Sequence, residues 1–272
     1  MDGQFIQSIQ FIQPWHQILP RDGGHILSFA GGGGKTSLLA TVAAQYCQLG
    51  VPVIATTTTR TEPLAWPGLE IWDQARLEQP PDWTTTGLLY IHDGTHADGK
   101  WRGLRPEVVD DLHRLWPEAV VLVEVDGSGG FPVKLHRENE PVWPGRTALV
   151  FWVLGLTAID GTVAEVLFRQ ERLPVPWTQT LDPEDSWSWR HTMQLLTGPG
   201  GYLSRQPAGL PAYLAVCQLD SLEDSLGLLE FTGQVLQETR IPLVLLCELA
   251  RETPHLQVVC LEETPEDLYG SG

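Results

Sequence analysis

Continuous apolar runs alternate along the chain with segments whose apolar residues recur every three or four positions. Ala119–Val125 and Ala148–Leu154 are such runs, and only Glu124 interrupts the first. A run that does not alternate with polar residues is typical of a strand covered on both faces, as in a parallel sheet. Further strands are predicted at His25–Phe29, Val51–Ala55, Leu69–Trp72, Leu88–His92, Ala212–Val216, Pro242–Cys247 and Leu256–Cys260.

Helices are predicted between these strands. Thr36–Leu49 carries its apolar residues on one side and ends where Gly50 and Pro52 follow. Pro106 is well placed to open a helix over Arg105–Trp116. The remaining predicted helices are a short docking helix within residues 1–21, Asp160–Arg172, Pro183–Leu196 and Ser221–Arg240. Strands that alternate with helices indicate βαβ units and the α/β class.

The segment between the strand His25–Phe29 and the next helix is the most informative one. It consists of four glycines, a lysine and two hydroxyl residues: Gly31, Gly32, Gly33, Gly34, Lys35, Thr36 and Ser37. Successive glycines let backbone N–H groups point into a tight turn, and the positive end of a helix attracts anions. Lys35 adds a charge for catalysis, and the Thr36 hydroxyl is a candidate Mg²⁺ ligand. These residues therefore predict a binding site for a nucleotide triphosphate.

This loop departs from the usual pattern of such sites. G-x-x-x-x-G-K-[ST] requires glycine at position 29, where the chain has Phe29. Counted from Gly31, the residues fit G-G-x-G-K-T, which is similar to the loop of the iron-protein and Min-type ATPases. Those proteins carry an additional lysine where Ala30 stands here. A flexible glycine linker is the alternative, and the order of strand, loop and helix argues against it.

A second group of candidate residues follows the strand Ala119–Val125. Asp126 comes at its carboxyl end, where ligands bind in open α/β sheets, and is expected to act in catalysis and to hold Mg²⁺ through water. Asp126 to Gly129 fits D-x-x-G, whose glycine amide is expected to bind a terminal phosphate. Glu124 leaves the same face of the strand about 7 Å away. It is either a catalytic group that positions water or a structural acid.

Two other polar segments each have a functional and a purely structural explanation. The threonines at positions 56–59 precede Arg60, and Thr58 is a candidate to complete the Mg²⁺ shell at the carboxyl edge. The alternative is that they are β-branched residues ending a strand. His92 and His96 lack an identifiable third ligand, which favours a surface turn over a metal site.

Composition narrows the possible partners. The chain has 34 acidic and 17 basic residues and a net charge of −17. This charge repels nucleic acid and anionic membranes, so neither is expected as a partner. The apolar stretches are too short to span a bilayer, and the N-terminus lacks a signal-peptide pattern. The four cysteines show no C-x-x-C spacing and indicate free thiols in a reducing compartment, so we expect a cytoplasmic protein.

Taken together, these motifs resemble those of the YqeC family, the accessory proteins associated with selenium-dependent molybdenum hydroxylases. That family shows G-A-G-G-K-T, T-T-T-T-[KR], and V-E-A-D-G-S-x-G-x-P-x-K followed by Glu-Pro. The corresponding segments here are Gly31–Thr36, Thr56–Arg60, Val123–Lys134 and Glu140-Pro141. The resemblance implies a nucleotide-dependent step in maturing or delivering a molybdopterin-type cofactor. It also implies a molybdenum hydroxylase or other cofactor-assembly proteins as partners.

The resemblance is looser at the late strand Ala212–Val216. The family often ends that strand with an Asn-Lys-x-Asp-like motif, similar to the guanine-reading motif of GTPases. This chain has Cys217-Gln218-Leu219-Asp220 instead. Asp220 is expected to accept a hydrogen bond from a purine. Because the Asn is missing, the sequence does not decide between ATP and GTP as the nucleotide.

The expected fold is an α/β, three-layer P-loop NTPase-like sandwich with a mostly parallel central sheet. It is expected to form one domain over residues 1–272. Residues 1–21 are the docking segment, residues 22–150 are the nucleotide-binding core, and residues 151–272 complete the sheet.

Three functions fit these features. The leading one is a Mg²⁺-dependent NTPase in which Thr58–Arg60 and Gly127–Gly130 act as switches. The second is a small-molecule kinase or nucleotidyl transferase for a cofactor precursor, with Lys134 or Arg137 anchoring the substrate. The third is a nucleotide-sensing binding module without catalysis. Each of these functions is compatible with a homodimer whose subunits meet across the nucleotide.

Overall fold

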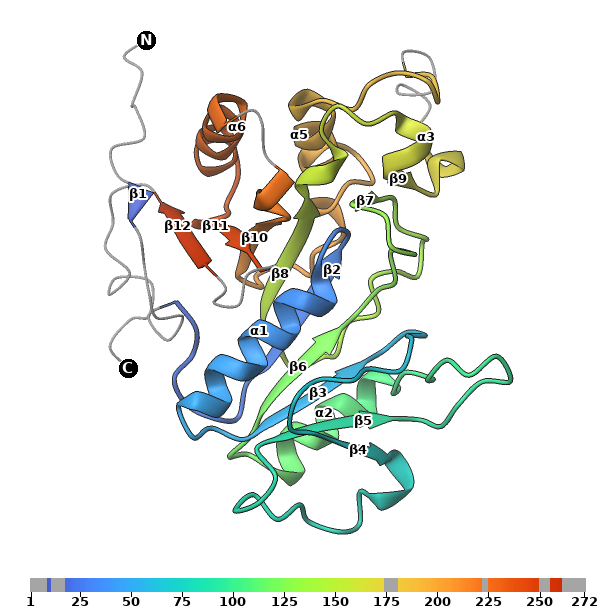
Figure 1. The fold of residues 1–272 in the computed structure, drawn as a ribbon, viewed down its shortest axis with the longest axis vertical. Coiled ribbons are helices and arrows are strands. Elements are labelled where there is room, and N and C mark those ends of the chain that lie inside the picture. Colours follow the sequence, from blue (N-terminus) through green and yellow to red (C-terminus); the bar gives the residue numbers. More distant parts are fainter. Residues whose placement is uncertain (1–8, 11–17, 174–180, 222–224, 250–254, 261–272) are drawn as a thin grey trace.

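The computed structural model describes residues 9–10, 18–173, 181–221, 225–249 and 255–260. Its centre is a ten-stranded sheet in the order β1-β12-β11-β10-β8-β2-β6-β3-β5-β4 (Figure 1). The bounds are β1 Ile9–Gln10, β2 Ile26–Gly31, β3 Val53–Thr57, β4 Leu69–Asp73, β5 Leu88–His92, β6 Val120–Glu124, β8 Thr147–Gly155, β10 Ala212–Cys217, β11 Leu243–Glu248 and β12 His255–Cys260. A second, two-stranded sheet pairs β7 (Val133–Lys134) with β9 (Leu167–Phe168) in parallel.

The central sheet is mostly parallel, as the continuous apolar runs predicted. From β11 to β4 in the order above, each strand is parallel to the next. Only β12 and β1, at one edge, pair in the antiparallel sense. The carboxyl ends of the parallel strands therefore meet at one edge of the sheet, where open α/β sheets bind their ligands.

Helices cover both faces of the sheet. Among the described residues they are α1 (Lys35–Gln48), α2 (Pro106–Leu115), α3 (Val163–Val166), α5 (Trp189–Thr197) and α6 (Ser225–Glu238). The helix α1 lies in front of the sheet in Figure 1. Its apolar side chains pack on that face. Those of α2, α5 and α6 pack on the opposite face. The result is a three-layer α/β sandwich of the P-loop NTPase-like kind.

The prediction of one helix over Asp160–Arg172 is wrong. The segment instead forms the single turn of α3, the strand β9 and a 3₁₀ turn, η4 (Gln170–Arg172). Thr162 and Glu165 form a capping box that starts α3. The chain then leaves the helix because β9 pairs with β7, and Arg169 adopts a left-handed φ of 67° that no α-helix accommodates.

Three other predicted helices change at their boundaries. Residues 9–10 form the strand β1 rather than part of a docking helix, and the remainder of 1–17 lies outside the described residues. The helix predicted from Pro183 begins at Trp189, where Ser188 caps it together with His191. The last helix, α6, begins at Ser225, and Ser221 belongs to the 3₁₀ turn η6 (Leu219–Ser221). The other predicted helices and strands are confirmed within a few residues.

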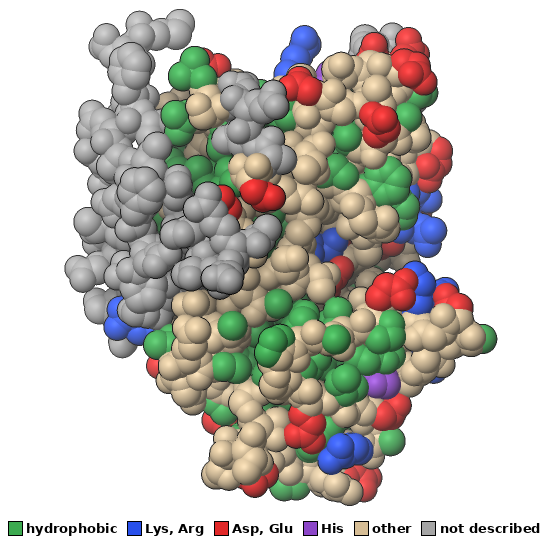
Figure 2. All heavy atoms as spheres, viewed as in Figure 1, with side chains coloured by type: hydrophobic (Ala, Val, Ile, Leu, Met, Phe, Trp, Pro, Cys, Tyr) green, Lys and Arg blue, Asp and Glu red, His purple; other side chains and the backbone are tan. Residues whose placement is uncertain are grey.

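The surface carries many acidic side chains, and Figure 2 shows them spread over the upper and lower parts of one face. Cys217 and Cys247 are buried free thiols, and Cys47 is a half-buried one. Within the described ranges, no helix has both the length and the apolar character needed to cross a membrane.

Candidate nucleotide-binding site

The glycine-rich loop connects the carboxyl end of β2 to the first residue of α1. Gly33 has a φ of +67°, a conformation that side-chain-bearing residues rarely adopt. A Cβ added at Gly33 would lie 2.3 Å from the Cα of Gly155 and 2.8 Å from the carbonyl oxygen of Pro132. Only glycine therefore fits this position, where the loop runs close against β8 and the segment before β7 (Figure 1).

The backbone N–H groups of the loop fall into two sets. Those of the first three glycines bond to other parts of the chain, and those at the start of α1 have no acceptor within the helix. The Gly31 N–H donates to Asp126, the Gly32 N–H to the Val153 carbonyl and the Gly33 N–H to the Phe131 carbonyl. Gly34 caps α1 without a side-chain hydrogen bond. The N–H groups of the first turn, residues 35–37, have no acceptor within the helix and carry its positive partial charge. An anion would be attracted to this helix end.

The Lys35 side chain reaches back across the loop and is buried, with 3% exposure. Its Nζ donates to the Gly31 carbonyl at 2.5 Å and lies 3.2 Å from Asp126 Oδ1. A second carboxylate, Glu124, places Oε1 3.7 Å away. In this arrangement the lysine is paired with protein acids beside the same helix end that would attract a phosphate.

Thr36, in the first turn of α1, and Glu124, at the end of β6, face one another. This partly exposed pair marks the entrance of the loop. The Thr36 hydroxyl donates to Glu124 Oε2 at 3.1 Å, and the Glu124 side chain is 16% exposed. Burial raises the pKa of Glu124, and the charge of Lys35 offsets part of that increase. A hydroxyl and a partly exposed carboxylate together form a set of hard oxygen donors of the kind that Mg²⁺ prefers.

Asp126 lies deeper and is fully buried. It accepts hydrogen bonds from the Gly31 N–H at 2.9 Å and from His136 Nε2 at 2.6 Å, and it has Lys35 and a second lysine, Lys134, within 3.4 Å. Burial alone would raise the pKa of Asp126, but these cations and hydrogen bonds outweigh it and hold the pKa well below its usual range. The structure therefore places Glu124, not Asp126, next to the Thr36 hydroxyl.

The buried network continues beyond Asp126. Lys134 Nζ donates to the Gly127 carbonyl at 2.7 Å and to Glu140 Oε2 at 3.0 Å. Burial lowers the pKa of Lys134, although both carboxylates oppose this shift. Arg169 donates two hydrogen bonds to Glu140, one of them 2.9 Å from Nη2 to Oε1. Burial would raise the pKa of Glu140, but Arg169 and Lys134 lower it to about 2.

His136 was not among the candidate residues, and the structure makes it part of the network. Its ring lies edge-on to Trp152 and Tyr202, and its Nδ1 is buried without a partner among the described residues. A neutral ring that donates from Nε2 to Asp126 leaves Nδ1 as an acceptor, whereas a protonated ring would bury an unpaired N–H. Burial accordingly lowers the pKa of His136, despite the opposing pull of Asp126. One sequence feature could have pointed to His136. It lies two residues after Lys134, and this spacing places both side chains on one face of a strand.

The threonines after β3 use their hydroxyls within the protein. The Thr57 hydroxyl donates to the Glu124 carbonyl at 2.8 Å, and the Thr58 hydroxyl donates to the Val142 carbonyl at 2.9 Å. The Thr58 N–H also bonds to the Glu124 carbonyl. The two bonds to the Glu124 carbonyl hold the segment at the end of β6, and the third joins it to Val142.

The remaining candidate residues lie around the loop or on the surface. Ser37 and Asp220 are exposed, the latter in η6. Gly129 is exposed, has a φ of +61° and lies against the ring of Phe168. The end of β10 does approach the loop, because a Cβ at Gly34 would lie 2.9 Å from the Cβ of Cys217.

His92 is the buried last residue of β5, and His96 lies in the turn that follows this strand. His92 stacks on Trp101 with ring centroids 4.9 Å apart, and its Nδ1 is 3.1 Å from the Gly94 carbonyl. The described residues contain no group of three or more His, Cys, Asp or Glu side chains arranged to hold a metal ion. The predicted surface turn is therefore wrong for His92, which is buried in β5, while His96 does lie in the turn.

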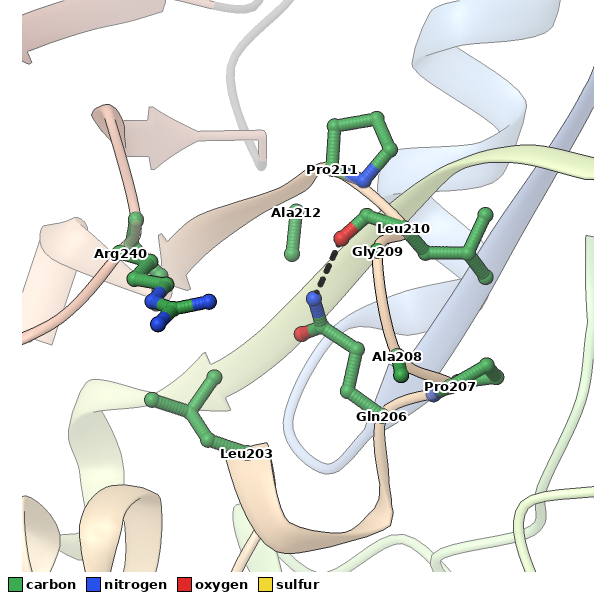
Figure 3. Close-up of a pocket in the computed structure, with 10 residues that line it drawn as sticks. Leu203, Gln206, Pro207, Ala208, Gly209, Leu210, Pro211, Ala212 and Arg240 are labelled. Carbon is green, nitrogen blue, oxygen red and sulfur yellow. Dashed lines mark hydrogen bonds between the residues drawn. The ribbon is translucent and has the colours of Figure 1, made fainter.

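A cavity of about 440 Å³ lies at the opposite, amino-terminal end of β10 (Figure 3). Apolar side chains such as Leu203 and Leu210 form much of its wall, and Arg240 extends toward it. The Gln206 amide, which also lines it, is engaged by the Leu210 carbonyl and by Trp152 Nε1. This cavity is separate from the glycine-rich loop.

The parallel sheet, with a glycine-rich loop and a lysine at the start of the first long helix, defines an α/β protein of the P-loop NTPase-like class. The family model described as YqeC protein matches residues 27–171. The chain is also 30% identical over 192 residues to the "Uncharacterized protein YqeC" of Escherichia coli (strain K12), covering 68% of this chain and 72% of that protein. The chain belongs to the YqeC family.

Proposed function

We propose that the chain binds the triphosphate of ATP or GTP at the start of α1 and hydrolyses it. The observation that carries the proposal is the meeting of Lys35, Thr36 and Glu124 at one helix end whose first-turn N–H groups have no acceptor within the helix. Those N–H groups and the Lys35 ammonium would stabilise the charge that spreads over the transferred phosphoryl group.

The same residues fit a magnesium ion. The Thr36 hydroxyl would be a direct ligand and Glu124 would bind through water, because its side chain is partly exposed. The ion would neutralise charge on the β- and γ-phosphates. Asp126 fits this position less well, since it is fully buried and already surrounded by donors. Its part would be to hold Lys35 and the Gly31 backbone in place.

The cellular role proposed here rests on the family and not on the site. We propose that nucleotide binding serves the maturation or delivery of a molybdopterin-type cofactor to a molybdenum hydroxylase. The segments Thr58–Arg60 and Gly127–Gly130 would respond to the γ-phosphate, because the first is hydrogen-bonded to the end of β6 and the second follows Asp126.

Titration of the purified protein with ATP and GTP, with and without Mg²⁺, tests the proposal. We expect Mg²⁺-dependent binding and slow phosphate release, both lost in Lys35→Ala. Lys100→Ala is the matched control, because that lysine lies on the surface beside Glu62. Failure of both nucleotides to bind would refute the proposal. Phosphate release that requires an added small molecule would identify a kinase instead, and binding without any turnover would identify a nucleotide sensor.

A further inference from the structure

Six charged side chains form an alternating series that begins at the entrance of the loop. In order they are Glu124, Lys35, Asp126, Lys134, Glu140 and Arg169, and each lies within 3.7 Å of the next. Three acids therefore alternate with three bases and balance one another. Such balance is needed because isolated charges are costly to bury.

This inference rests on the proposed function. For a nucleotide to bind, the negative charge of Asp126 needs a second cation beside it. Lys35 contacts Asp126 here, but it must shift to the phosphates when a nucleotide binds. Asp126 has no exposed surface, so water cannot replace the departing cation. Without a second cation, Asp126 would retain Lys35 and oppose nucleotide binding.

Lys134 meets this requirement. The chain has only three lysines, and two of them, Lys35 and Lys134, lie on the one carboxylate of Asp126. The Lys134 side chain is fully buried, so a nucleotide has no direct access to it. Its other acidic partner, Glu140, is held independently by two hydrogen bonds from Arg169. Lys134 can therefore compensate Asp126 without leaving Glu140 unpaired.

We propose that Asp126 holds Lys35 in the nucleotide-free protein and that Lys134 is the positioning residue that keeps Asp126 compensated when Lys35 moves to the phosphates. Lys134 acts through Asp126 and does not touch the nucleotide. Its charge sets how readily Lys35 is released, and thus the affinity of the loop for a nucleotide.

The first test uses the nucleotide-free protein and reads the lysines directly. With three lysines in the chain, acetic anhydride labelling followed by mass spectrometry resolves each one, and the partly exposed Lys100 is the internal reference. We expect Lys35 to react several-fold more slowly than Lys100 in the wild type and to react faster in Asp126→Asn. Equal rates for Lys35 and Lys100 in the wild type would overturn the inference, whether or not a nucleotide binds.

The second test measures the affinity for Mg–ATP and Mg–GTP. Lys134→Met should weaken binding about tenfold, because Lys35 is then the one lysine left to compensate Asp126. Adding Asp126→Asn to that variant should restore binding, because no charge remains to retain Lys35. Lys134→Arg should stay close to the wild type, and Lys100→Met is the matched control.

The outcomes separate the inference from the proposed function. If the wild type binds a nucleotide and Lys134→Met binds it equally well, the inference fails and the proposed function stands. A loss that Asp126→Asn does not restore would show a merely structural role for Lys134 and would also overturn it. If the wild type binds neither nucleotide, the proposed function fails, and the inference fails with it. Should Lys134→Met not fold, Lys134→Gln, which retains a hydrogen-bond donor, gives the same comparison.

Discussion

The Thr36 hydroxyl donates a hydrogen bond of 3.1 Å to Glu124 Oε2 and so joins the first turn of α1 to the carboxyl end of β6. Asp126, two residues further on, turns its carboxylate to the Gly31 N–H and His136 instead. Two acids that are close in sequence thereby acquire different roles, because one reaches the entrance of the loop and the other is enclosed.

Glu124→Gln should weaken the Mg²⁺ dependence of nucleotide binding and slow phosphate release by roughly tenfold or more, the range seen when a partner of a metal ligand is removed. Binding measured without Mg²⁺ should change little. Calorimetric titration and a phosphate-release assay measure the two effects. Glu107→Gln, an exposed acid in the first turn of α2, is the control. Unchanged Mg²⁺ dependence would remove Glu124 from the metal site.

Arg169→Met should destabilise the protein by about 3 kcal/mol or more, because it removes one partner of a largely buried ion pair. Glu140 would keep Lys134 but lose both hydrogen bonds from the guanidinium. Urea unfolding followed by circular dichroism measures the change. Arg172→Met, an exposed arginine three residues away, should change stability by less than about 0.5 kcal/mol. Equal effects of the two substitutions would contradict a special role for the Arg169–Glu140 pair.

His136→Gln should alter how stability depends on pH. Because burial lowers the pKa of His136, the folded protein keeps the ring neutral while the unfolded chain takes up a proton below about pH 6.5. This residue therefore contributes a loss of up to about 1.4 kcal/mol per pH unit as the pH falls from 6.5 toward the folded pKa.

Unfolding free energies of wild type and His136→Gln at pH 7.5 and 5.5 measure that loss. We expect the wild type to exceed the variant by about 1–3 kcal/mol at pH 7.5 and by less at pH 5.5. His25 and His191 also have pKa values lowered by burial, but they titrate in both proteins and cancel in the difference. A difference that stays constant across this range would show that His136 does not remain neutral.

Gly33→Ala should destabilise the protein by about 2–5 kcal/mol, the sum of a strained backbone and a steric overlap. The alanine Cβ would lie 2.3 Å from the Cα of Gly155, which is backbone and cannot turn away. Gly50→Ala is matched to it, because Gly50 has a similar φ of +73° but nothing within 4 Å of the added Cβ. It should lose only the backbone part, about 1–2 kcal/mol. Thermal unfolding of both variants measures the difference, and equal losses would mean that the loop can move away from β8.

Local patterns predicted much of this fold. The continuous run Ala119–Val125 specified a strand buried on both faces, and β6 is such a strand at the centre of the sheet. The segment Asp160–Arg172 was predicted wrongly because its helical spacing is overridden by the pairing of β9 with β7, a contact between residues far apart in the chain. The sequence also could not place Lys134 and His136 in the buried network, because their contacts with Asp126 are visible only in the folded structure.

Local sequence specified the glycine-rich loop, its lysine and the strand–loop–helix order, because these depend on the backbone freedom of glycine and on the periodicity of neighbouring residues. Tertiary structure alone decided which acid faces Thr36. That choice depends on the register that sets Glu124 beside Phe29 of β2 and Thr57 of β3. It also decided that Asp126 shares two lysines, since Lys134 reaches it from β7. Such placements follow from packing between distant segments, which local propensity does not encode.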